Sequence, residues 1–134
     1  MQKILLIEDE PEARALLARR LSAHRFEVLE AGDGIEGSRK AKESKPDLII
    51  LDLKLPGEDG IQIYHGLRQD PSLQKVPVLF LTAISTGGSM SKESLALIAS
   101  AKHGIEMKGE YVVMGKPYDS KQLVETIRRM VGEP

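Results

Sequence analysis

The sequence LIILDLKLPGEDG, residues 48–60, decides the fold that we expect for this chain. Four apolar residues run without interruption into Asp52, and the pair Pro56 and Gly57 follows shortly afterwards. A continuous apolar run that ends in turn residues is typical of a strand buried on both faces of a parallel sheet. Asp52 is therefore expected at the carboxyl end of a strand, where parallel α/β sheets place their ligands. Because an Asp after a strand is more often a turn or capping residue, other residues have to decide its role.

The composition indicates a single globular domain over residues 1–134, with 41% apolar and 29% charged residues. A net charge of −1 gives no argument for nucleic acid or an anionic membrane as the main partner. The absence of cysteine excludes disulfides, thiolate metal sites and cysteine nucleophiles. No apolar run approaches the ~20 residues that a membrane helix needs, and the first residues do not resemble a signal peptide. We therefore expect a cytoplasmic protein that binds neither membranes nor nucleic acid directly.

Strand-like and helical patterns alternate five times along the chain. Apolar runs predict strands at 3–7, 26–31, 48–52, 76–81 and 111–114. Helical spacing predicts helices at 11–21, 35–44, 61–69 and 91–101, and a last helix up to 131 that Asp119 or Ser120 caps. This alternation predicts an α/β fold, a doubly wound parallel sheet of five strands with helices on both faces. The least regular part is the extended segment 84–110, which opens with the composition of a flexible loop at 85–89.

Polar side chains gather at the predicted strand ends, namely Glu8, Asp9, Asp52, Thr82 and Lys116. The first and third strands of a doubly wound sheet are neighbours, so the three carboxylates are expected to meet. Such a cluster raises pKa values unless a cation lies among the acids. Oxygen ligands with room for water suit Mg²⁺ better than Zn²⁺ or copper. A carboxylate nucleophile, a divalent cation, a lysine and a hydroxyl are the groups that phosphoryl transfer to an aspartate requires.

Each of these residues also has an ordinary structural explanation. Glu8 and Asp9 are acids before a helix, Thr82 suits a strand, and Lys116 suits a solvated loop. Taken singly, the structural explanation is as good for the acids and better for Thr82 and Lys116. Only their joint placement at the strand ends favours a functional site.

Together these segments resemble a response-regulator receiver domain. The resemblance lies in the acidic pair after the first strand, in PDLIILDLKLPGEDG at 46–60, in PVLFLTA at 77–83 and in KPY at 116–118. It covers nearly the whole chain and implies a flavodoxin-like sheet with the strand order 2-1-3-4-5. It also implies that Asp52 accepts a phosphoryl group from a phosphohistidine on a sensor histidine kinase or a histidine phosphotransfer protein.

The resemblance further implies a role for each matching residue. Four residues are expected to hold Mg²⁺: Glu8, Asp9, Asp52 and, through its backbone carbonyl, Lys54. Three groups are expected to bind the phosphoryl group: the Thr82 hydroxyl, the Ala83 N–H and the Lys116 amine. The bond between Lys116 and Pro117 is expected to be cis. Phosphorylation is expected to reshape the face of the fourth helix, fifth strand and fifth helix for an unknown downstream protein. The chain is then no enzyme beyond its own phosphorylation and dephosphorylation.

Two departures from the family pattern affect the output face. The span from Thr82 to Lys116 is longer than the family's usual span by roughly a dozen residues. The family places an aromatic residue three positions before the lysine, where this chain has Val113. Tyr111 lies on the same strand face, so it fills that role only if the fifth strand is extended or shifted. Lys54, two residues after Asp52, is predicted to influence the lifetime of the phosphoryl group.

Three other interpretations are weaker. The stretch 32–37 matches GxGxxG, with Asp52 downstream as a ribose ligand, but dinucleotide binding leaves Glu8, Thr82 and Lys116 unexplained. A Mg²⁺-dependent aspartyl phosphatase needs a second Asp where Lys54 stands. A P-loop is excluded because Pro117 follows Lys116 in place of Ser or Thr. The three histidines, His24, His65 and His103, are expected to have surface or capping roles.

Overall fold

A five-stranded parallel sheet forms the centre of the molecule. The computed structural model describes residues 1–55, 58–83, 91–116 and 118–132. The strands are β1 (Gln2–Ile7), β2 (Phe26–Ala31), β3 (Leu48–Asp52), β6 (Val78–Ala83) and β7 (Tyr111–Lys116). Their order in the sheet is β2-β1-β3-β6-β7, and every neighbouring pair is parallel. Numbered along the chain this order reads 2-1-3-4-5, which confirms the predicted doubly wound, flavodoxin-like sheet.

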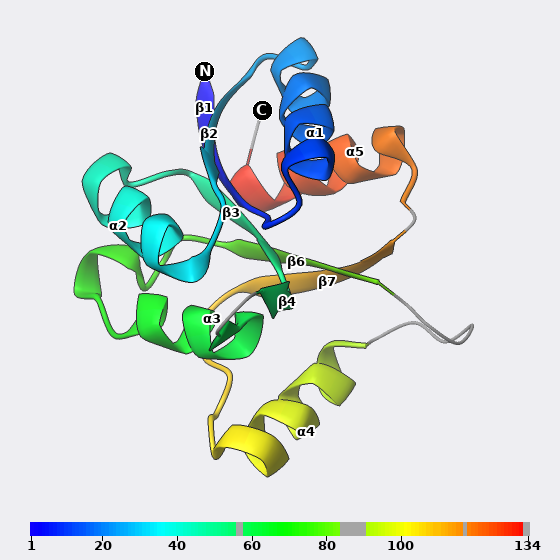
Figure 1. Ribbon diagram of the computed structural model, residues 1–134. Helices are drawn as coiled ribbons and strands as arrows, with labels where there is room; N and C mark the ends of the chain where they lie inside the picture. Colours follow the sequence, from blue (N-terminus) through cyan, green and yellow to red (C-terminus); the bar gives the residue numbers. More distant parts are fainter. Residues whose placement is uncertain (56–57, 84–90, 117, 133–134) are drawn as a thin grey trace.

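Helices cover both faces of the sheet (Figure 1). The helices are α1 (Pro11–Ala23), α2 (Gly34–Ser44), α3 (Gly60–Arg68), α4 (Lys92–His103) and α5 (Ser120–Val131). Helices α1 and α5 lie on one face, and α2, α3 and α4 lie on the other. Asp119 caps α5 and Ser91 caps α4 through their side chains. No described helix has both the length and the apolar character that crossing a bilayer requires.

The element boundaries differ from the predicted ones in a few places. The fourth strand of the sheet begins at Val78 and includes Thr82 and Ala83, which we had expected to follow it. Two short elements were not predicted: the hairpin of β4 (Lys54–Leu55) with β5 (Glu58–Asp59), and the 3-10 turn η1 (Pro71–Leu73). The predicted turn at 56–57 and the predicted loop at 85–89 fall outside the described residues.

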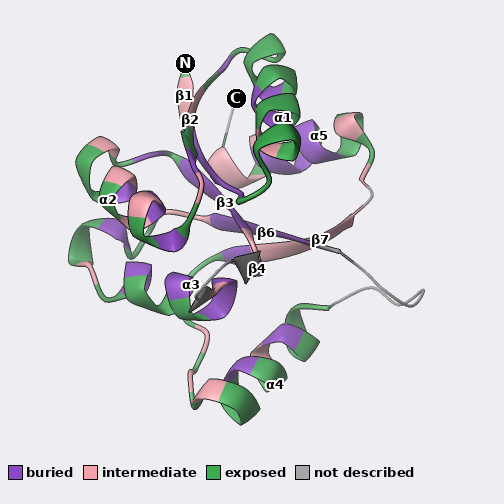
Figure 2. Cartoon of the chain, in the orientation of Figure 1, coloured by how far each residue is buried: buried purple, intermediate pink, exposed green. Residues whose placement is uncertain are grey.

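Each strand of the sheet sends alternate side chains into two separate apolar cores, because successive residues of a strand point to opposite faces. In β3, Ile49 and Leu51 join the core beneath α2, α3 and α4, whereas Leu48 and Ile50 join the core beneath α1 and α5. Both faces of β3 are therefore buried, as the unbroken apolar run predicted (Figure 2).

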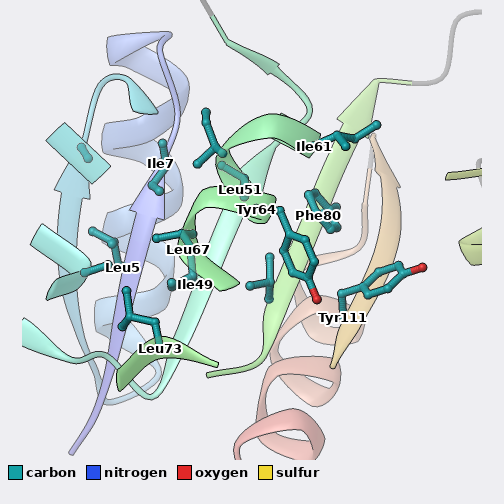
Figure 3. Packing of buried hydrophobic residues seen from close by; sticks show 14 of the residues in the cluster. Leu5, Ile7, Ile49, Leu51, Ile61, Tyr64, Leu67, Leu73, Phe80 and Tyr111 are labelled. Carbon is teal, nitrogen blue, oxygen red and sulfur yellow. The ribbon is translucent and has the colours of Figure 1, made fainter. Parts of the chain in front are cut away.

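An aromatic cluster fills the core between the sheet and α3 (Figure 3). The rings of Tyr64, Phe80 and Tyr111 pack with centroid separations of 5.3 to 5.9 Å and tilted or edge-on geometry. These are the arrangements that aromatic pairs favour. The cluster joins α3 to both β6 and β7, so it fixes the position of α3 over this half of the sheet.

Arg68 ties two connections to α3, the one between α3 and β6 and the one between α4 and β7. Its side chain is buried, with 8% exposed, and its guanidinium lies 4.6 Å from the centre of the Tyr64 ring. It donates short hydrogen bonds to three backbone carbonyls, those of Leu73 (2.8 Å), Val76 (2.7 Å) and Glu110 (2.9 Å). Gly109 lies so close that a Cβ there would be 2.5 Å from Nε of Arg68. The sequence pattern had given no sign of this arginine's role.

Candidate phosphoacceptor site

The sheet brings the three predicted acids together. Glu8 follows β1 directly and Asp52 ends β3, and these neighbouring strands pair Ile7 with Leu51. Glu8, Asp9 and Asp52 each offer a carboxylate oxygen within 4.8 Å of the other two. Glu8 is buried, Asp52 is half-buried and Asp9 is exposed. The acids therefore form a pocket that is closed on the protein side and open to solvent at Asp9.

Lys116 reaches the same acids from the end of β7. Its Nζ lies 3.2 Å from Oε1 of Glu8 and 3.3 Å from Oδ2 of Asp52. The two carboxylates thus share one ammonium group, which offsets their repulsion. Lys116 therefore meets the acids as predicted, although it lies 64 residues from Asp52 in the sequence.

The electrostatics of the pocket favour a further cation. Burial raises the pKa of Glu8, and the neighbouring Asp52 carboxylate raises it further, against the opposing effect of Lys116. Burial lowers the pKa of Lys116, but the charges of Asp52 and Glu8 outweigh it, so the pKa lies above its ordinary value. Oε2 of Glu8 is buried and has no hydrogen-bond partner among the described atoms. An oxygen-only ligand set with one buried oxygen unpaired fits a hard divalent cation such as Mg²⁺.

Thr82 and Ala83 lie next to this pocket at the end of β6. Leu81 pairs with Asp52, so Thr82 is one residue further towards the carboxyl edge, and its side chain is buried. Ala83 pairs with Lys116. Both therefore stand where the sequence analysis expected the groups that bind a phosphoryl oxygen.

Lys54 is the first residue of β4 and pairs with Asp59 across the hairpin. No described contact tests its carbonyl as a metal ligand. Pro117 falls outside the described residues, and so does the expected cis bond that precedes it.

The backbone of Gly60 packs directly against the backbone of Asp52, a role that was not predicted from the sequence. Its N–H donates to the carbonyl of Leu53 at 2.8 Å. A Cβ on Gly60 would lie 2.6 Å from the carbonyl oxygen of Asp52, which is closer than any real side chain approaches. The last glycine of the stretch 48–60 is therefore required by close backbone approach.

A cavity of about 270 Å³ opens beside the acids on the α1 side of the sheet. Its lining includes Glu8, Asp52, Lys116, Leu16, Arg20 and Tyr118. Burial raises the pKa of the Tyr118 phenol at this wall. A larger cavity of about 480 Å³ lies between α3 and residues 104–109, and its lining contains none of the predicted site residues. The chemistry therefore points to the smaller cavity.

The glycine-rich stretch 32–37 serves as a helix cap. The Asp33 side chain accepts from the backbone N–H of Glu36 at 2.8 Å, and the Glu36 carboxylate accepts from the N–H of Gly32 at 2.7 Å. A Cβ on Gly37 would lie 2.4 Å from Cδ1 of Ile7, so this glycine allows α2 to pack closely on β1. Amides that would cradle a pyrophosphate are bonded to the chain's own carboxylates, which argues against dinucleotide binding.

Tyr111 does not lie beside Thr82. In the register of β6 and β7, Tyr111 pairs with Val78 and Thr82 pairs with Gly115. Four residues of strand separate the two positions, roughly 13 Å. Tyr111 is buried against Tyr64 and Phe80, with Nζ of Lys92 4.5 Å from its ring centre. The strand is extended beyond the predicted end at residue 114, as far as Lys116, but its register still leaves Tyr111 opposite Val78 and away from Thr82.

The histidines differ from one another. His24 ends α1 as its C-cap and His65 is exposed, as expected. His103 is only 15% exposed, and its Nε2 lies 2.6 Å from Oδ2 of Asp59. The expectation of a surface or capping role was therefore wrong for His103, because its side chain is largely buried against Asp59, a residue 44 positions away in the sequence.

Comparison with known proteins decides the family. A family model described as the response regulator receiver domain matches residues 4–128. The chain belongs to this family. Receiver domains act in two-component signalling, where they interact with histidine kinases or phosphotransfer proteins and bind Mg²⁺ at an acidic pocket. They are signalling domains rather than classical enzymes.

Several known receiver proteins resemble this receiver domain over nearly its whole length. The DNA-binding dual master transcriptional regulator RpaA of Synechocystis is 33% identical over 98% of this chain and 49% of its own length. The chemotaxis protein CheY4 of Vibrio cholerae superposes with a TM-score of 0.78 at 25% identity, over 97% of this chain and 98% of CheY4.

The receiver domain of the sensor histidine kinase PA1611 of Pseudomonas aeruginosa has a TM-score of 0.77 at 27% identity, with 98% of both chains covered. That structure has magnesium coordinated in its active site cleft. The present chain spans about half the length of the first curated relatives that it matches.

Proposed function

We propose that this receiver domain accepts a phosphoryl group on Asp52 from a phosphohistidine of a sensor histidine kinase or a histidine phosphotransfer protein. The observation that carries the proposal is the meeting of Glu8, Asp9 and Asp52 within 4.8 Å, with the amine of Lys116 3.3 Å from Asp52. These groups come from three strands that are far apart in the sequence. A carboxylate at a strand end with an adjacent ammonium group has the parts that aspartyl phosphorylation needs.

In the proposed transfer, an Asp52 carboxylate oxygen attacks the phosphorus of the donor. A new O–P bond forms as the P–N bond to the donor imidazole breaks, and the imidazole leaves with the electron pair. Lys116 then shifts its ammonium group towards the charge that develops on the phosphoryl oxygens. The Thr82 hydroxyl and the Ala83 N–H are the proposed donors to the same oxygens, which is supported by their place beside Asp52 and Lys116.

Mg²⁺ fits the acidic pocket as the cofactor of this reaction. Glu8, Asp9 and Asp52 are its proposed ligands, together with the backbone carbonyl of Lys54. Bound there, it neutralises charge on the transferring group. The unpaired buried oxygen of Glu8 supports this assignment, because a cation gives that oxygen a partner.

The proposal also covers the setting of the switch. Residues 1–134 form a single domain in this proposal, and phosphoryl transfer takes place in the cytoplasm. An unknown downstream protein binds the face that contains α4, β7 and α5. No direct nucleic-acid contact by these residues is proposed, although the relative RpaA is a DNA-binding protein. The proposed activity is limited to the chain's own phosphorylation and dephosphorylation.

Acetyl phosphate with Mg²⁺ tests the proposal directly. Intact mass spectrometry is expected to show the mass of one phosphoryl group on the parent protein and none on Asp52→Asn. Asp33→Asn is the matched control, because Asp33 is not one of the clustered acids and the amide still caps a helix. A chelator is expected to abolish uptake. Equal uptake by Asp52→Asn, or uptake that ignores the chelator, contradicts the proposal.

A further inference from the structure

Asp59, at the end of the hairpin that follows Asp52, contacts helix α4 through its side chain. Asp59 ends the β4–β5 hairpin, and its Oδ1 accepts from the N–H of Gln62 at 3.1 Å as the cap of α3. Its Oδ2 is 2.6 Å from Nε2 of His103 and 3.7 Å from Nζ of Lys102, both at the end of α4. One carboxylate therefore holds the start of α3 with one oxygen and the end of α4 with the other.

The backbone connects this carboxylate tightly to the proposed phosphoacceptor. Asp59 is followed by Gly60, which packs on the carbonyl of Asp52 with no room for a Cβ and bonds to Leu53. Across the hairpin, Asp59 pairs with Lys54. A displacement of the Asp52 backbone therefore has to move Gly60, and Asp59 moves with it.

Helix α4 has a small buried surface, besides the contact of Lys92 with the Tyr111 ring. Its buried residues are Leu95 and Ala99 alone, whereas Leu97 is 71% exposed. On β7, the residue opposite Thr82 is Gly115. The position three residues before Lys116, where the family has an aromatic residue, is Val113 and pairs with Phe80. The Asp59–His103 pair is a direct side-chain contact between the hairpin that follows Asp52 and this helix.

We propose that the Asp59–His103 pair is the mechanical link by which occupancy of Asp52 changes the position of α4. The inference rests on the proposed function, because it takes the aspartyl phosphate as the input. His103 is a positioning residue in this scheme and does not contact the transferred group. Its loss uncouples α4 from the site and leaves phosphoryl uptake intact.

Amide chemical shifts measured by NMR, before and after beryllofluoride and Mg²⁺ are added, test the link. In the parent, shifts are expected at Leu53 and Gly60 and along α4. In His103→Ala the shifts at Leu53 and Gly60 are expected to persist, and most of the α4 shift is expected to be lost. His103→Gln keeps an N–H donor at similar reach, so it is expected to restore the α4 response.

His65→Ala is the matched control, since His65 is an exposed histidine on α3, and its α4 response is expected to equal that of the parent. If His103→Ala does not fold, Asp59→Asn takes its place, because it keeps the cap and removes the charge. An unchanged α4 response in the uncoupled variant overturns the link while the proposed function stands. A parent that shows no response at Leu53 and Gly60 overturns both.

Discussion

At the scale of single residues, Lys116 is the built-in counter-charge of the acidic pocket. We predict that Lys116→Met binds Mg²⁺ about tenfold more tightly, a change of about 1.4 kcal/mol, because Glu8 and Asp52 lose their shared ammonium group. Phosphoryl uptake from acetyl phosphate is expected to slow by about a hundredfold. Isothermal titration with Mg²⁺ and mass spectrometry measure the two effects. The exposed Lys121, replaced by Met, is the control, and an unchanged Mg²⁺ affinity in Lys116→Met contradicts the prediction.

Gly60 and Gly66 are two glycines of one helix with opposite surroundings. Gly60→Ala is expected to cost about 2–3 kcal/mol of stability, since its Cβ collides with the Asp52 backbone. Nothing lies within 4 Å of a Cβ on Gly66, so Gly66→Ala is expected to stabilise by up to about 1 kcal/mol. Urea unfolding of both variants measures the contrast. Similar stabilities for the two variants rule out the close approach.

The sequence was sufficient to predict the position of residues that lie at the carboxyl ends of strands. Asp52 and Lys116 belong to this group, because a parallel sheet collects its carboxyl ends at one edge whatever the loops do. The roles of Arg68 and His103 could not be predicted, because each has a partner about 40 residues away that no periodic pattern indicates.

At the scale of elements, the segments that lead into β6 and β7 both depend on Arg68. We predict that Arg68→Met destabilises the protein by about 3–5 kcal/mol, because several carbonyls lose a charged donor in a buried place. Hydrogen exchange is expected to quicken across residues 104–109. Urea unfolding gives the free energy, and Arg39→Met, which removes an exposed pair with Glu43, is expected to change it by less than about 0.5 kcal/mol. Equal losses in the two variants refute the role of Arg68.

The small buried surface of α4 explains why one side-chain pair has influence over it. Burial of Leu95 and Ala99 contributes about 2–4 kcal/mol. The half-buried hydrogen bond between Asp59 and His103 is a sizeable addition to so small a contribution. Strands and helices with sustained apolar spacing were predictable, α4 included. The β4–β5 hairpin was not, since strands of two residues are too short for a pattern.

At the scale of the whole molecule, stability depends on what neutralises Glu8. The fold raises the pKa of Glu8, so the folded state favours the protonated acid. The stability that this protonation contributes is lost as pH rises from 4.5, the ordinary pKa, through the raised pKa of the folded state. We predict that the rise in Tm caused by Mg²⁺ grows over the same interval, because the cation replaces the proton. At about 100 times its Kd, Mg²⁺ adds about 2.7 kcal/mol.

Thermal unfolding with and without Mg²⁺, at a series of pH values, checks this linkage. Glu8→Gln is expected to flatten the pH dependence, since the amide does not titrate. If Mg²⁺ raises the Tm of the parent by the same amount at every pH, the predicted linkage between Mg²⁺ binding and Glu8 protonation is contradicted.

The sheet divides the apolar interior in two, and this division affects how partner proteins can bind. The core under α2, α3 and α4 and the core under α1 and α5 share a wall of backbone and no side chains. A shift of α4 therefore need not repack the helices on the opposite side, where the smaller cavity opens beside Asp52. We therefore expect that a phosphodonor bound on the α1 side and a partner that reads α4 can occupy the molecule at the same time.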